Sequence, residues 1–216
     1  MQTNGEAGNG RIHGARGVPA ATASGRQLRP DELLSLEQYA RSRNEFRARV
    51  LEHKRPRTVA VGPHTTWLFE DRLTVQYQVQ EMLRAERIFE ADAIQQELDS
   101  YNPMIPDGTN LKVTLLIEYT DPAERHVALQ RLKGLESCCW LGVGDQRCRA
   151  VADEDLERGN DVKTSAVHFL RFELSAAACA ALKAGAALSL GIDHPAYRHE
   201  VVADAATVRS LAADLA

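Results

Sequence analysis

Residues 68–106 hold the densest helical pattern in the chain, and any fold of this sequence has to bury the apolar side of that pattern. Apolar side chains recur here at the three- to four-residue spacing of amphipathic helices. In the first half they are Leu73, Val75, Tyr77, Val79, Met82 and Leu83, and in the second half Ile94, Leu98 and Tyr101. Asn102 precedes Pro103, which pushes it out of the helical region. The stretch therefore predicts two consecutive helices, the second of which ends near residue 102.

Polar side chains of the same stretch give the candidate site. Glu81 and Arg84 lie three positions apart and share one helix face, where they can pair. Glu70 and Arg72 lie where the first helix begins, next to a predicted hairpin turn at His64. We expect these groups to form one concave polar patch. The candidate ligand- or partner-binding residues are His64, Glu70, Arg72, Gln80, Glu81, Arg84 and Asn102. A solvated helix face with surface ion pairs is the competing interpretation.

The rest of the chain favours strands between short helices. Residues 111–119 form the clearest strand pattern, and residues 137–151 read as a hairpin. Further strands are expected at residues 165–174, 187–192 and 197–202. The expected fold class is α+β, a mostly antiparallel sheet with packed helices. Residues 1–28 show no recurring apolar pattern, which predicts a disordered leader followed by one domain at residues 29–216.

Composition places the chain among ordinary globular proteins. It has 216 residues, 44% hydrophobic and 26% charged. No apolar run approaches the roughly 18 residues that a membrane span needs, and the first residues lack the apolar region of a secretory signal. The expected location is therefore the cytoplasm, with no membrane partner.

The charge is unevenly distributed along the chain. Residues 1–57 carry 11 basic and 6 acidic side chains, a net charge of +5. The remainder carries 15 basic and 24 acidic side chains, a net charge of −9, so the whole chain has a net charge of −4. The basic front end raises the possibility of nucleic-acid binding through the first helix, which is expected to begin at Asp31 or Ser35 and to run to about His53. The overall acidity disfavours it, as does the lack of aromatic residues interleaved with Arg41, Arg43, Arg47 and Arg49.

Cysteine and histidine spacing predicts neither a metal nor a cofactor. Cys138, Cys139, Cys148 and Cys179 form no C-x-x-C pair, and their spacing fits no zinc or iron–sulfur pattern. His199 and Glu200 are neighbours on a predicted strand, so they point to opposite faces. No motif assigns a catalytic residue, and the identity of any catalytic group stays open.

Four segments resemble the bacterial family called domain of unknown function 3501. They are LSLEQYARSRNEFRARV (34–50), LFEDRLTVQYQVQEMLRAER (68–87), IQQELDSYNPMIP (94–106) and SAVHFLRFEL (165–174). Members of this family tend to be encoded beside rubrerythrin and a cysteine-rich iron–sulfur oxidoreductase subunit. The resemblance implies a cytoplasmic accessory or binding protein of a redox or peroxide-defence system, with those two proteins as partners.

Two other functions remain open on residue chemistry. One is a small-molecule enzyme in which Glu70 or Glu81 acts as base while Arg72 or Arg84 holds an anionic substrate. The other is nucleic-acid binding through the basic first helix. The accessory role is the leading hypothesis for two reasons: the family resemblance implies it, and the sequence contains no specific catalytic motif.

Overall fold

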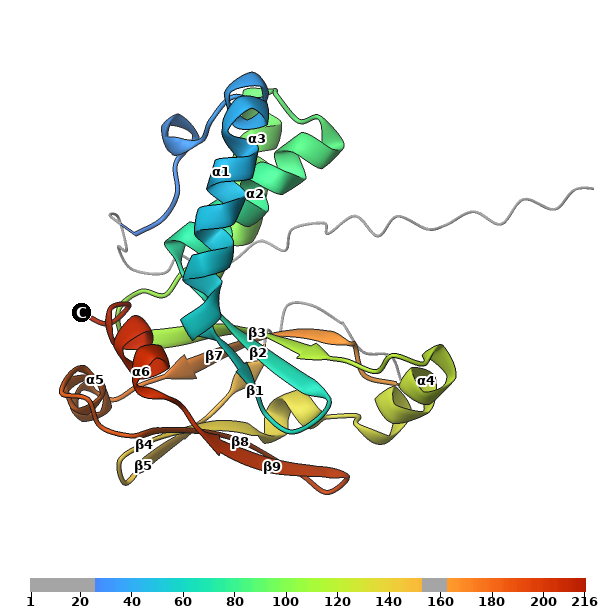
Figure 1. Ribbon diagram of the computed structural model, residues 1–216, viewed down its shortest axis with the longest axis vertical. Coiled ribbons are helices and arrows are strands. Elements are labelled where there is room, and N and C mark those ends of the chain that lie inside the picture. The colour runs from blue at the N-terminus through green and yellow to red at the C-terminus, as the bar shows by residue number, and fades with distance from the viewer. Residues whose placement is uncertain (1–25, 153–162) are drawn as a thin grey trace, which may run out of the picture.

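Three helices form a lobe that rises from a body of two β-sheets (Figure 1). The computed structural model describes residues 26–152 and 163–216. The lobe contains α1 (Leu36–Lys54), α2 (Arg72–Glu86) and α3 (Ala91–Tyr101), together with short 3-10 turns at Pro30–Glu32, Arg55–Arg57 and Asn102–Met104. The two central helices predicted from residues 68–106 are thus present as α2 and α3.

Local sequence explains where these helices begin and end. At the start of α1 the Ser35 hydroxyl accepts a hydrogen bond from the backbone N–H of Gln38. At the start of α2 the Asp71 carboxylate accepts one from the backbone N–H of Thr74. Arg87 ends α2 in the left-handed conformation. The lobe has its own apolar cluster of Leu28, Val75, Val79, Leu83, Leu98 and Ile105.

The larger sheet has five strands in the order β1-β2-β3-β7-β6, and all its pairs are antiparallel. The strands are β1 (Thr58–Ala60), β2 (Thr65–Glu70), β3 (Asn110–Ile117), β6 (Val151–Ala152) and β7 (Val167–Glu173). β2 leads directly into α2 through Asp71, so the C-terminal end of β2 lies at the base of the lobe.

The smaller sheet is also antiparallel, with the order β5-β4-β8-β9. Its strands are β4 (Cys139–Val143), β5 (Gln146–Arg149), β8 (Leu188–His194) and β9 (Tyr197–Val202). Apolar side chains of both sheets, such as Trp67 and Leu190, belong to one buried core. Helix α4 (Pro122–Arg131) lies at one end of the two sheets, and α5 (Ala176–Lys183) and α6 (Ala205–Ala212) lie at the other (Figure 1). The predicted α+β fold with antiparallel sheets is confirmed.

The start of the fold differs from the prediction. The leader expected at residues 1–28 lies outside the described residues as far as residue 25, but residues 26–28 are described. Leu28 is 2% exposed and belongs to the apolar cluster of the lobe. The fold therefore includes Leu28. The sequence did not predict this, because a single leucine in a Gly- and Arg-rich segment gives no periodic signal although it fills a core position.

Among the described residues, none of the helices has both the length and the apolar character that crossing a bilayer requires.

Candidate functional site

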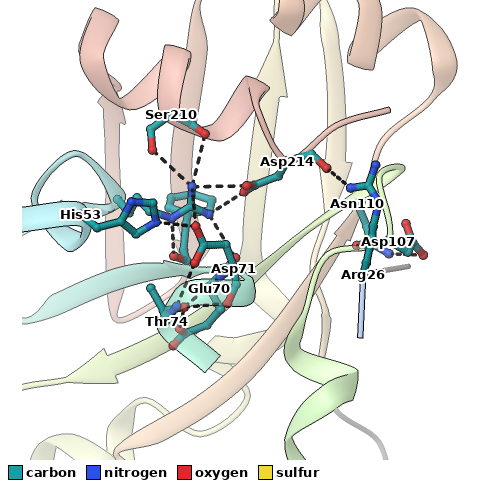
Figure 2. Close-up of polar contacts among 11 residues, drawn as sticks. Arg26, His53, Glu70, Asp71, Thr74, Asp107, Asn110, Ser210 and Asp214 are labelled. Carbon is teal, nitrogen blue, oxygen red and sulfur yellow. Dashed lines mark hydrogen bonds and ion pairs between the residues drawn. The ribbon is translucent and has the colours of Figure 1, made fainter. Parts of the chain in front are cut away.

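A buried polar network joins the lobe to the sheets (Figure 2). At its centre is Arg57, whose side chain is 1% exposed. Its guanidinium contacts the Asp214 carboxylate at 2.5 Å and donates to the Phe69 and Glu70 carbonyl oxygens at 3.0 and 3.1 Å. It also donates to Ser210 in α6, at the carbonyl oxygen and the hydroxyl. One arginine therefore ties together the end of α1, the end of β2 and the C-terminal segment.

Asp71 links this arginine to the last turn of α1. One carboxylate oxygen caps α2 by accepting from the Thr74 amide at 2.9 Å. The other lies 2.5 Å from Nε2 of His53 and 3.6 Å from Arg57. Burial alone would raise the pKa of Asp71, but Arg57, the Thr74 amide and His53 together hold it below its ordinary value. At Asp214 burial prevails over Arg57, and the pKa of that carboxyl is raised.

Glu70 lies beside this network and is also buried. Its side chain is 1% exposed, and its carboxylate accepts hydrogen bonds from the Thr74 and Thr114 hydroxyls at 2.5 and 2.6 Å. Thr114 comes from β3 and Thr74 from α2, so Glu70 joins a helix to the sheet. A substrate has no open approach to a carboxylate in this position.

Two predicted site residues hold the backbone of the chain's own N-terminal segment. The Gln80 amide accepts from the Leu34 N–H at 2.6 Å and donates to the Leu34 carbonyl at 3.2 Å. The Asn102 amide does the same for Leu28, at 2.8 and 3.0 Å. Arg72 forms an ion pair with Glu32 of the same segment at 2.6 Å. Gln80, Asn102 and Arg72 thus share one function, which is to fix residues 28–34.

Glu81 points to α1 instead. Its carboxylate receives two hydrogen bonds from Arg43, at 2.7 and 2.8 Å, and one from the Tyr39 hydroxyl at 2.6 Å. The Arg43 hydrogen bonds, with that of Tyr39, lower the pKa of Glu81 to about 2 despite its partial burial. Arg84 is exposed and adds only a weaker electrostatic attraction. The partner expected within the helix is therefore replaced by one from α1.

His64 lies apart from the lobe, in the turn between β1 and β2. Its ring stacks on Tyr119 with centroids 4.0 Å apart, and its backbone N–H donates to the Tyr197 hydroxyl at 2.9 Å. Tyr119 also lines a surface pocket of about 560 Å³ at α4. The other lining residues are Ala123, Glu124, Val127, Ala128, Arg131, Leu132 and Ala196.

The structure does not bring the predicted residues into one concave patch. Glu70 is buried at the base of the lobe, Gln80, Asn102 and Arg72 hold the N-terminal segment, Glu81 faces α1, and His64 lies at the far turn. Whether any of them binds a ligand or partner stays a prediction. Sequence analysis missed His53, Arg57 and Asp214, and no local pattern could have found them, since Arg57 and Asp214 are 157 positions apart.

The described cysteines are free thiols. Burial raises the pKa of Cys138, Cys139 and Cys148, and Cys139 is fully buried. Within residues 26–152 and 163–216, His, Cys, Asp and Glu side chains form no group of three or more that could hold a metal ion.

Together these features define an α+β protein whose polar network anchors a helical lobe to a two-sheet body. A family described as "Protein of unknown function (DUF3501)" matches residues 27–215, and the chain belongs to this family. The chain is also similar to a solved structure, a novel protein of unknown function from Burkholderia pseudomallei. The two share 52% sequence identity with a TM-score of 0.84, over 88% of this chain and 100% of the other. No curated protein matches the chain.

Proposed function

We propose that this chain is a cytoplasmic accessory protein that binds a partner through α1. The partners are rubrerythrin and a cysteine-rich iron–sulfur protein of a redox or peroxide-defence system. The choice of partners rests on the family to which the chain belongs, in which such genes tend to be neighbours. The docking surface rests on α1.

The exposed side of α1 is the observation that supports docking. Of its 19 residues only Tyr39 and Val50 are buried. The Phe46 and Tyr77 rings stack with centroids 6.1 Å apart, and cations lie over both, Arg49 at 4.7 Å and Lys54 at 5.9 Å. Exposed arginines and partly exposed aromatic rings are the residue types that protein interfaces favour. A basic, aromatic surface of this kind fits an acidic face on the partner.

An enzyme built on Glu70 or Glu81 has weaker support. Both carboxylates already accept hydrogen bonds from neighbouring side chains, and the pKa of Glu81 is too low for a base near neutral pH.

Binding measurements on the purified full chain test the proposal. The chain is immobilised and exposed to rubrerythrin and to the iron–sulfur protein from the same organism, at two salt concentrations. We expect measurable binding to at least one of them, weakened about tenfold or more by Arg47→Glu with Arg49→Glu. The matched control is Lys183→Glu with Arg198→Glu, which reverses two exposed charges away from the lobe. The proposal fails if neither protein binds, or if both double variants have the same effect.

A further inference from the structure

The N-terminal segment is held in the way that proteins hold an extended peptide. We define the strap as residues 26–35, and the strap site as the surface of α2 and the α3 end that contacts it. Figure 1 shows the strap, in blue, running from near the sheets to the free end of the lobe, where α1 begins and returns toward the sheets. Its only regular element is one 3-10 turn, Pro30–Glu32, so the strap has few internal backbone hydrogen bonds to stabilise it.

Side-chain amides satisfy the strap backbone. Gln80 and Asn102 each bond both the N–H and the carbonyl of one residue, Leu34 and Leu28 respectively. Gln76 donates to the Glu32 carbonyl at 3.0 Å. Five hydrogen bonds therefore go to backbone atoms, which any sequence offers. Main-chain hydrogen bonds of this kind give affinity in peptide recognition, whereas side-chain pockets give selectivity.

Three strap side chains supply that selectivity. Leu28 is 2% exposed among the apolar residues of the lobe, and Leu33 packs partly against the same cluster. Glu32 pairs with Arg72. The site therefore selects an aliphatic side chain, an acidic one four positions later, and an aliphatic one next to that.

We propose that the strap site is a recognition site for an extended segment of a partner protein, and that the strap occupies it in the free chain. The expected ligand has the pattern just described and a flexible continuation at its C-terminal end. A second copy of this chain does not fit this requirement. Its strap is joined through Ser35 to its own α1, and the space beyond Leu34 is already filled by the α1 of the first copy.

The test uses the full chain and a fluorescein-labelled peptide with the strap sequence RQLRPDELLS, followed by fluorescence anisotropy. In the unaltered chain the strap competes, so binding is weak. Leu28→Ala in the chain loosens the strap and should tighten peptide binding about tenfold, because a larger fraction of sites is free. Adding Asn102→Ala removes the same two hydrogen bonds from the strap and from the peptide, so the double variant should bind the peptide no more tightly than Leu28→Ala alone. A peptide with aspartate in place of its leucine at position 28 is the control and should not bind.

A second measurement on the unaltered chain covers the case in which Leu28→Ala does not fold. Amide hydrogen exchange is followed by NMR with and without excess peptide. The Leu28 and Leu34 amides of the chain should lose protection when peptide displaces the strap, while the Val79 amide in α2 keeps it. The proposal is overturned if protection is unchanged at saturating peptide, or if the folded Leu28→Ala chain binds the peptide no more tightly. These results do not depend on the α1 surface, so this proposal and the proposed function can fail separately.

Discussion

Arg57 is a charge that the fold has removed from water, so its partners matter more than those of surface arginines. Asp214 is the nearer of its two carboxylates, at 2.5 Å, and Asp71 lies at 3.6 Å. Removing one member of a buried pair leaves the other charge without full compensation. Surface pairs contribute little because water screens them.

Asp214→Ala should therefore lower the free energy of unfolding by about 3 kcal/mol, measured by urea denaturation. Asp193→Ala is the control. Asp193 pairs with Arg147 at a similar distance of 2.6 Å, but its side chain is 36% exposed. It should cost less than about 1 kcal/mol. Equal losses for the two variants would show that the buried Arg57–Asp214 pair stabilises the fold no more than a surface ion pair does.

Glu81 links stability to pH. Its pKa is about 2 in the folded chain against an ordinary value of 4.5, so its carboxylate favours folding when ionised. That contribution is complete above pH 4.5 and is lost as the pH falls toward 2. Urea denaturation of Glu81→Gln and the unaltered chain should show a stability difference that is constant above pH 4.5 and shrinks below it. Glu45→Gln, at an exposed position of α1, is the control; a pH-independent Glu81→Gln difference would contradict the prediction.

At the scale of elements, the strap contributes a core residue. Leu28→Ala should lower the free energy of unfolding by about 2–4 kcal/mol, because it leaves a cavity in the apolar cluster of the lobe. Leu51→Ala in α1 is the matched change, since Leu51 is 46% exposed and should cost under about 1 kcal/mol. If thermal or urea denaturation gives the same small loss for both, the strap is not part of the folded core.

The turn between β1 and β2 packs tightly against β9. Gly62 has φ +78°, and a Cβ at this position would lie 2.5 Å from the His199 ring and the Tyr197 hydroxyl. Gly185 has a similar φ of +86° with open space around it. Gly185→Ala should cost about 1 kcal/mol from backbone strain alone. Gly62→Ala should cost about 1–3 kcal/mol more, because residues of β9 have to move. Equal melting temperatures for the two variants would rule out the close packing.

Sequence periodicity predicted the helices and strands better than it predicted which side chains contact one another. Helices α2 and α3 and strands such as β3 follow from apolar spacing, which is a local property. The partner of Glu81 was predicted as Arg84 on the same helix, but Arg43 lies 38 positions away and forms the stronger pair. Gln80 and Asn102 were predicted as members of a polar ligand- or partner-binding patch. Their partners are backbone atoms of the strap, and backbone atoms carry no sequence signal.

At the scale of the whole molecule, two apolar cores of unequal size are joined by the Arg57 network. Among the described residues, the cluster between the sheets has 27 buried members and that of the lobe has 6. The free energy that holds a unit closed rises with the apolar surface it buries. The lobe should therefore open more easily than the sheets.

Native-state hydrogen exchange by NMR tests this difference. The Val79 amide in α2 should exchange through an opening of lower free energy than the Leu115 amide in β3, and with a weaker dependence on denaturant, since a partial opening exposes less surface. Both residues are fully buried, so burial alone predicts no difference between them. Equal opening free energies with equal denaturant dependence would mean that lobe and sheets unfold as one unit. In that case the Arg57 network couples the two cores completely, and a partner that binds α1 stabilises the sheets as strongly as the lobe.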